Sequence, residues 1–334
     1  MRVFLLGLIL AAVSLGAKTM DVYFIDTEGG KSTLIVSPSG QTLLIDAGYA
    51  GARDLNRILA AVKIAGVKQI DYLVVTHHHS DHVGGVPQLA ARLPVKHFID
   101  HGPNTETGPS PDALYKSYKD SWGASRHTVA IPGQQIPVKG LDIRVLASNG
   151  EAIASPLKGE GAPNPTCAST QKQTDVTTEN SRSMGLRIAF GKFRMLDLGD
   201  LTWNKELALV CPNNLIGTVD VFATSHHGAN DSGSPALVNA IKPRVGIMNN
   251  GVSKGGAASA GRTLRGSAGF LDLWQLHFAV AGGKDNNADE QFIANPDPDV
   301  AKDQGYSIKL SAESNGSFTV TNSRNNLSKS YKQP

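Results

Sequence analysis

The sequence predicts an α/β fold, and two observations lead to this class. Short runs rich in β-branched and aromatic residues alternate with segments whose apolar residues recur at helical spacing. Two histidine-rich loops each follow directly on a buried-strand pattern, which is where open α/β sheets place their functional sites. The composition agrees, because 40% hydrophobic and 18% charged residues in a chain of 334 suit a globular protein with a sizeable core.

The first 17 residues have the pattern of a secretory signal peptide. A positive residue, Arg2, precedes the apolar run 3–12, and small residues up to Ala17 suit cleavage. The apolar run is too short for a comfortable membrane span, although an uncleaved anchor or a buried strand would also fit it. We expect an exported protein, periplasmic or secreted, whose mature chain 18–334 is a single hydrolase domain without a stable membrane span.

The first half of the mature chain reads mainly as strands. Gly29-Gly30 and the turn-forming residues 37–40 separate the first three strand patterns, and the spacing of apolar residues before Gly66 predicts a helix. Strands are expected at 23–25, 32–36, 42–45, 71–76 and 95–100, and helices at 52–66 and 86–93.

The second half continues the alternation. Strands are expected on both sides of Gly191-Lys192 and at 219–225 and 244–250, and helices at 205–211 and 234–243. Two stretches near 147–180 and 251–269 are rich in small and polar residues, so we expect long loop insertions there. The polar tail from Asn322 is expected to fray.

Residues 76–85 read Thr-His-His-His-Ser-Asp-His-Val-Gly-Gly, which concentrates metal-ligand residue types in one loop. Because side chains alternate in an extended segment, His77 and His79 point the same way and could bind one ion, while the histidine between them points away. Asp81 and His82, where the chain turns into a helix, could reach a second ion. A solvated polar loop is the alternative.

This loop resembles the T-H-x-H-x-D-H-x-G-G signature of the metallo-β-lactamase superfamily. Further segments resemble other landmarks of that superfamily in the same order: Leu-Ile-Asp-Ala-Gly at 44–48, Leu-Gly-Asp at 198–200 and Ser-His-His-Gly at 225–228. The resemblance implies an αββα sandwich with one or two metal ions between its sheets. Within the superfamily, segments 26–31 and 180–186 are most similar to the hydrolase domain of DNA-uptake competence proteins.

The resemblance also implies which residues hold the metal. His77 and His79 would bind the first ion, Asp81 and His82 the second, and Asp200 would bridge both ions. His226, with His227 as the alternative, would complete the second ion's ligands. A helix cap or turn residue is the alternative role of Asp200.

The sequence departs from the superfamily pattern at one ligand. Many members have a further histidine before the bridging aspartate, but no histidine occurs between His127 and His226, and Asn180 falls at about that place. An amide oxygen is a harder and weaker ligand than imidazole. The sequence therefore leaves open whether one or two divalent ions bind, and whether they are zinc or manganese. Asn180 and His101, which ends a predicted strand, are candidate substrate contacts.

The chemistry that follows is metal-dependent hydrolysis. A divalent ion makes hydroxide available at neutral pH, and Asp81 would orient the nucleophile or accept its proton. The segments Gly-Pro-Ser at 108–110 and Gly-Ser-Ala-Gly at 266–269 do not form the Gly-x-Ser-x-Gly elbow of a serine hydrolase.

The substrate stays open between two main classes. A phosphodiester, with nucleic acid as a possible partner, is favoured by the competence-like segments, and a lactam, lactone or thioester in a small molecule is the alternative. The net charge of +3 does not by itself indicate nucleic-acid binding. A non-catalytic binding module on the same fold, the pairing of Cys167 with Cys211 and the oligomeric state also remain open.

Overall fold

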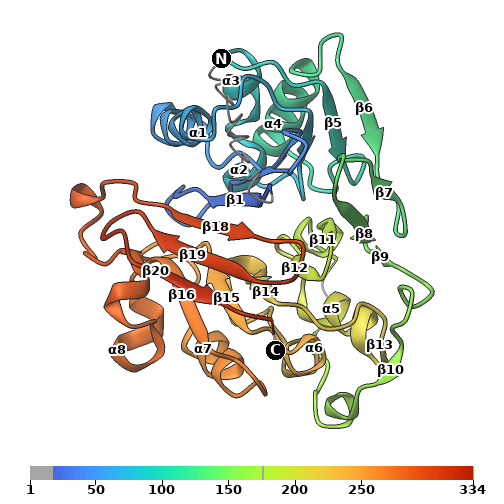
Figure 1. The fold of residues 1–334 in the computed structure, drawn as a ribbon. Helices are drawn as coiled ribbons and strands as arrows, with labels where there is room; N and C mark the ends of the chain where they lie inside the picture. Colours follow the sequence, from blue (N-terminus) through green and yellow to red (C-terminus); the bar gives the residue numbers. More distant parts are fainter. Residues whose placement is uncertain (1–17, 175–176, 334) are drawn as a thin grey trace, which may run out of the picture.

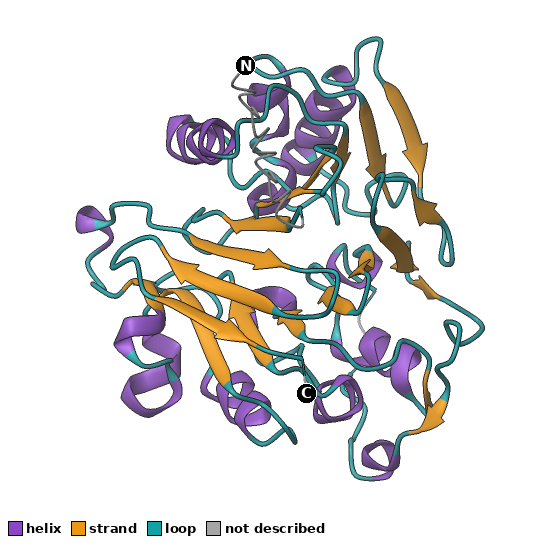
Figure 2. Cartoon of the chain, in the orientation of Figure 1, coloured by secondary structure: helices purple, strands orange, loops and turns teal. Residues whose placement is uncertain are grey.

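The structure, a computed structural model, describes residues 18–174 and 177–333, so the expected signal peptide at 1–17 lies outside the described residues. Two large β-sheets lie between two groups of helices (Figure 1). The same view coloured by secondary structure shows the helices on the outside and the strands between them (Figure 2). The expected αββα sandwich is confirmed.

The first sheet has the strand order β20-β19-β18-β1-β2-β3-β4-β5-β6. Its strands β3 to β6 are parallel to one another, and the remaining neighbours are antiparallel. The bounds are β1 Met20–Phe24, β2 Thr33–Val36, β3 Thr42–Ile45, β4 Tyr72–Val74, β5 His97–Asp100, β6 Arg126–Val129, β18 Ile308–Ala312, β19 Phe318–Asn322 and β20 Ser328–Tyr331.

The second sheet has the order β17-β16-β15-β14-β12-β11-β8-β7, and β9 pairs with β8. Its strands β12, β14, β15, β16 and β17 are parallel. The bounds are β7 Gln135–Ile136, β8 Asp142–Ser148, β9 Glu151–Ala152, β11 Gly185–Phe190, β12 Phe193–Asp197, β14 Val221–Ala223, β15 Val245–Met248, β16 Asp272–His277 and β17 Ile293–Asn295; β10 Ala162–Pro163 and β13 Asn213–Asn214 form a separate pair.

The helices divide between the outer faces of the two sheets (Figure 1). Beside the first sheet lie α1 Ala52–Ile64, α2 Ser80–Val83, α3 Val86–Ala90 and α4 Pro109–Asp120; beside the second lie α5 Trp203–Val210, α6 Pro235–Ile241, α7 Ala258–Arg265 and α8 Gly283–Asn286. Short 3₁₀ helices are η1 Pro165–Ala168, η2 Asn180–Arg182, η3 Ser225–Gly228, η4 Val280–Gly282, η5 Glu290–Phe292 and η6 Val300–Lys302. No helix within residues 18–174 and 177–333 is long and apolar enough to cross a membrane.

The hydrophobic core follows the alternation of side chains along the strands. Val22 and Phe24 of β1 belong to the cluster that includes side chains of both sheets, such as Phe222 of β14. Tyr23, between them in sequence, belongs to a second cluster with helix residues such as Tyr118 of α4. The first sheet is therefore covered on both faces, which explains why its strands read as almost continuous apolar runs.

Several expectations from the sequence need correction. The segment 251–269 is not only a loop, because it contains α7. The tail from Asn322 does not fray, since β19 and β20 pair at the edge of the first sheet. The segment 147–180 is mostly irregular, as expected, but it carries short elements such as η1. Cys167 and Cys211, which the sequence left open, form a disulfide.

The parallel strands bring the predicted site together. β3 and β4 of the first sheet end at the residues that lead to Asp46 and to the histidine loop. β12 and β14 of the second sheet end just before Asp200 and η3. Because parallel strands present their carboxyl ends at one edge, four loops that are distant in sequence meet there.

A buried carboxyl on α5 predicts a pH dependence of stability. Glu206 is fully buried, and it accepts hydrogen bonds of 2.9 Å from the backbone N–H groups of Gly233 and Ser234, just before α6. Burial raises the pKa of Glu206 to about 7 in spite of these bonds. The folded protein holds this proton more tightly than the unfolded chain. The contribution of Glu206 to the free energy of unfolding therefore falls by about 3 kcal/mol as the pH rises from about 4.5 to about 7.

The side chain of the Glu206→Gln variant cannot ionise at this position. The free energy of unfolding of the variant minus that of the wild type should therefore increase from pH 5 to pH 8. Urea unfolding at both pH values measures this difference. Glu313→Gln, which changes an exposed glutamate, serves as the control and should follow the wild type. A Glu206→Gln curve that runs parallel to the wild-type curve would contradict the assignment.

Candidate metal centre

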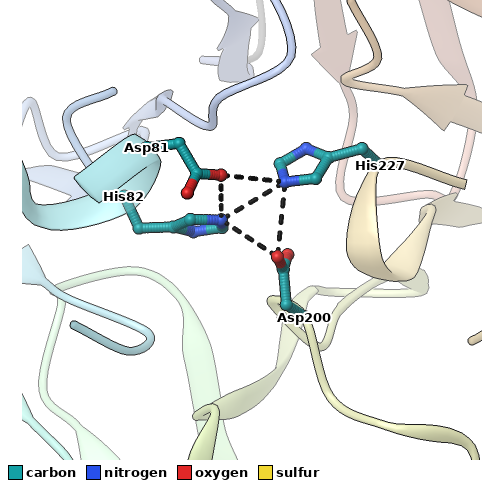
Figure 3. Close-up of side chains that lie close together, drawn as sticks. All are labelled: Asp81, His82, Asp200 and His227. Atoms are coloured by element: carbon teal, nitrogen blue, oxygen red, sulfur yellow. Dashed lines mark hydrogen bonds and ion pairs between the residues drawn. The ribbon is translucent and has the colours of Figure 1, made fainter. Parts of the chain in front are cut away.

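Four buried side chains from three segments converge on one point between the sheets (Figure 3). Asp81 and His82 come from α2, Asp200 follows β12, and His227 lies in η3. His82 Nε2 lies 3.1 Å from Asp81 Oδ2, 3.2 Å from Asp200 Oδ2 and 3.3 Å from His227 Nε2. His227 Nε2 lies 3.3 Å from each of the same two carboxylate oxygens.

Both imidazoles of this cluster are held by their other ring nitrogen. His82 Nδ1 donates to Asp46 Oδ2 at 2.8 Å, and Asp46 also accepts from the N–H and hydroxyl of Thr76. His227 Nδ1 donates to the carbonyl of Asn249 at 2.9 Å. With Nδ1 carrying the hydrogen, each Nε2 presents a lone pair to the cluster, which is the arrangement typical of metal-binding histidine.

The donor set therefore fits a divalent cation. Two carboxylates and two imidazoles, all buried, offer ligand atoms within 4.8 Å of one another. The second oxygen of Asp200, Oδ1, is buried without a hydrogen-bond partner among the described residues. A cation would satisfy this oxygen and, once His82 has lost its proton, would bind the Nε2 lone pairs of both imidazoles.

The charges of the cluster shift its pKa values strongly. Although burial alone would raise the pKa of Asp200, His227 and His82 hold it well below the ordinary value. Burial works against a charged His82, but Asp200, Asp81 and Asp46 raise the pKa of His82 well above its ordinary value. A metal ion must therefore displace a proton from His82, and its affinity should increase with pH.

His77 and His79 lie next to this cluster, and their side chains face each other as the alternation predicts. His77 Nε2 lies 3.0 Å from His79 Nδ1 and 3.8 Å from Asp200 Oδ2. His79 Nε2 contacts Glu106 Oε1 at 3.1 Å, which orients its ring. The histidine between them, His78, points to the other side of the loop and donates to Glu179.

The structure corrects the order of preference between the two consecutive histidines of η3. Both have left-handed backbone conformations, with φ of 46° at His226 and 55° at His227, so their side chains diverge. His227, not His226, joins Asp81 and His82. His226 is held by Asp231 at 2.7 Å, and its Nε2 lies 3.6 Å from Asp200 Oδ2 and 3.4 Å from Asn180 Nδ2.

The two candidate substrate contacts have different outcomes. His101 is fully buried and donates from Nε2 to Glu179 Oε1 at 2.7 Å, so the structure does not place it beside the cluster and its contact with substrate stays a prediction. Asn180 is half-buried beside His226, and its Oδ1 is buried without a partner among the described residues. Asn180 is thus at the centre, where it could contact an ion or a substrate.

The sequence analysis assigned no role at the centre to three residues that contact its side chains. Asp46 stands in the Leu-Ile-Asp-Ala-Gly segment, which signalled it, but its bond to His82 was not foreseen. Glu179 directly precedes Asn180, and no motif marked it. Lys254, from the segment after β15, donates to Asp81 Oδ2, and its side chain remains 37% exposed.

Fold and centre together define a class of protein, the αββα proteins that hold metal ions between two sheets at the ends of their strands. Residues 25–155 match the family model described as the metallo-beta-lactamase superfamily. The chain carries a domain of the metallo-β-lactamase superfamily.

Similar proteins span several activities. The competence protein ComA of Neisseria gonorrhoeae is 26% identical over 221 residues, which cover 66% of this chain but only 25% of that protein. Ribonuclease Z of Bradyrhizobium diazoefficiens is 31% identical over 127 residues, 35% of this chain and 39% of that enzyme. The solved metallo-beta-lactamase fold protein YhfI from Bacillus subtilis is 13% identical with a TM-score of 0.47, covering 77% of this chain and 96% of that one.

The geometry of η3 gives a direct test of the metal ligands. His227→Ala should weaken binding of the ion beside Asp81 and His82 by more than about 100-fold, because it removes a direct ligand rather than an outer contact. His226→Ala should leave that ion in place. Titration with cobalt(II), followed by metal analysis of the dialysed protein, measures both.

His97→Ala serves as the control, since His97 is on β5 and its side chain bonds to Thr128. Loss of the ion beside Asp81 and His82 from both the His226 and the His227 variant would show that the two side chains act on the same ion, against this assignment.

Proposed function

We propose that the protein is an exported metal-dependent hydrolase that cleaves a phosphodiester with a metal-activated water. One observation carries the proposal: four imidazole Nε2 atoms lie within 3.8 Å of a single carboxylate oxygen, Asp200 Oδ2. Three of these imidazoles are buried, and imidazole nitrogens gathered around a carboxylate oxygen form a donor set that suits divalent cations such as zinc. The four histidines are His77, His82, His226 and His227.

The ligands divide into two groups that share Asp200. Asp81, His82 and His227 would hold one ion. His77 and His79 would hold the other, and His226 would supply the third imidazole that Asn180 does not provide. The pair of histidines in η3 thus serves both ions, which favours a two-ion centre of zinc or manganese over a single ion.

Bound divalent ions would lower the pKa of a water from 15.7 to about 7 and stabilise the negative charge that develops on the substrate. Asp81 would orient the attacking water and accept its proton, because its Oδ2 atom faces both His82 and His227 at the centre. Asp46 and Asn249 would keep the two imidazoles in the tautomer that binds metal.

The choice of a phosphodiester rests on two cations near the centre, which are paired with Asp81 and Asp54, and on the relatives. Lys254, which reaches Asp81, lies 5.7 Å from the centroid of the Tyr49 ring, and Arg53 lies 5.9 Å from the same ring. Two cations beside one aromatic ring suit a phosphate that carries a planar group. Ribonuclease Z, by its name, acts on RNA, and ComA is a competence protein.

Export is part of the proposal. The pattern of residues 1–17 is that of a signal peptide, and the Cys167–Cys211 disulfide suits an oxidising compartment such as the periplasm or the exterior. A single hydrolase domain from 18 to 334 also belongs to the proposal. The pairing of β18 with β1 supports it, since the last strands complete the sheet that the first strands begin.

Loss of the proton acceptor should abolish the reaction. Asp81→Asn should lower kcat for bis(p-nitrophenyl) phosphate by about 100-fold or more, because general base catalysis contributes about 10² to 10⁴. Removal of metal with EDTA should have the same result, and added zinc or manganese should restore turnover of the wild type. Circular dichroism checks that the fold is kept.

The substrate class is tested with the same preparations. A cephalosporin lactam and a thioester are assayed in parallel, with His97→Ala as the control variant. Turnover of the lactam or the thioester without turnover of the phosphodiester would move the substrate assignment to that class. Full activity of Asp81→Asn would refute the mechanism.

A further inference from the structure

We propose that Glu179 is a positioning residue of the metal centre, whose buried carboxylate fixes the histidine loop and the loop after β5 to each other so that His77 and His79 face the first ion. This proposal rests on the metal-dependent function proposed above. Within the described part of the chain, Glu179 forms no hydrogen bond or ion pair with the donor atoms that face the ions. It therefore acts through the loops that it holds.

The Glu179 carboxylate accepts five hydrogen bonds. Oε1 accepts from the backbone N–H of His78 at 3.0 Å, from His78 Nδ1 at 2.9 Å and from His101 Nε2 at 2.7 Å. Oε2 accepts from the N–H of Thr105 at 2.9 Å and from its hydroxyl at 2.5 Å. The side chain is fully buried, so these donors take the place of water entirely.

The bonds to His78 determine where its two neighbours point. His78 lies between His77 and His79 in an extended segment, and consecutive side chains there point to opposite sides. Holding the ring and the backbone of His78 on one side therefore directs His77 and His79 to the other. Their ring nitrogens meet at 3.0 Å on that side.

The bonds to Thr105 fix the partner of His79. Thr105 precedes Glu106, and Glu106 Oε1 contacts His79 Nε2 at 3.1 Å. A single carboxylate thus holds both the loop that carries His79 and the loop that orients it. Glu179 also precedes Asn180, which lies beside His226, so a third segment of the centre is tied to the same point.

Hydrogen bonding accounts for the whole cluster of His78, His101 and Glu179, although these side chains also lie close enough together to hold a metal. An ion there would have to replace imidazole protons that already satisfy the carboxylate. An amide in place of Glu179 cannot accept at both ends, because its NH₂ group would face either the donors of Thr105 or those of His78 and His101. Glu179→Gln is therefore a nearly isosteric change that breaks one end of the cluster.

The test compares the wild type, Glu179→Gln and Asp71→Asn, each as the full mature chain. Asp71 is a matched control, since it is a buried carboxylate that accepts bonds from Thr42, Gln69 and Lys96 at the start of β4, away from the centre. Cobalt(II) is titrated into metal-free protein, and the visible absorption bands and the bound metal are measured.

The wild type and Asp71→Asn should bind two ions. Glu179→Gln should bind one of them about 10- to 100-fold more weakly, with an altered cobalt spectrum, and should keep the ion that His227→Ala removes. If Glu179→Gln does not fold, Thr105→Val, which removes one of the five donors, should weaken the same ion several-fold.

Three results would overturn the proposal, and they are distinguishable. Equal affinities and spectra for Glu179→Gln and the wild type would show that the carboxylate does not position the ligands. A third ion in the wild type, lost in Glu179→Gln, would make the cluster a metal site of its own. A wild type that binds no cobalt would remove the metal-dependent function itself.

Discussion

The structure depends on one buried negative charge, the carboxylate of Asp200 at the interface of the two sheets. A carboxylate can remain ionised without water only if cations or hydrogen-bond donors surround it. The fold supplies these groups from loops at the ends of β4, β12 and β14. The positions of these strands therefore determine which side chains surround the Asp200 carboxylate. Asp46, Asn249 and Asp231 contribute to the same arrangement, because each accepts a hydrogen bond that fixes the ring of one histidine near the Asp200 carboxylate.

The α/β class and the histidine loop could be predicted from the sequence because their signals are local, whereas the αββα sandwich and the roles of Asp200 and the pair at 226–227 were implied by the resemblance to the superfamily. The histidine loop places five candidate side chains within six positions, and the alternation of an extended segment separates His78 from its neighbours. The β-branched runs also predicted β2 to β5 closely, whereas β1 begins at Met20, three residues before the expected start. These features need no knowledge of the rest of the chain.

What the sequence could not predict depends on backbone geometry or on distant partners. The exchange of roles between His226 and His227 follows from two consecutive left-handed residues, which no composition rule indicates. Glu179 is 101 residues away from His78, and its significance appears only when the two loops meet. The strand β20 was misread as a frayed tail because one face of this sheet edge is polar, with two of its serines bonded to Thr319 and Thr321 across the strands.

The pairing of β1 with β18 has a consequence for how the chain folds. Met20 lies opposite Ala312, so the first strand of the first sheet gains its second neighbour only after almost the whole polypeptide has been synthesised. Contacts of such large sequence separation slow the search for the native topology. A nascent chain with this connectivity stays loosely structured for longer, and an unfolded chain is the form in which a polypeptide threads through a narrow translocation channel.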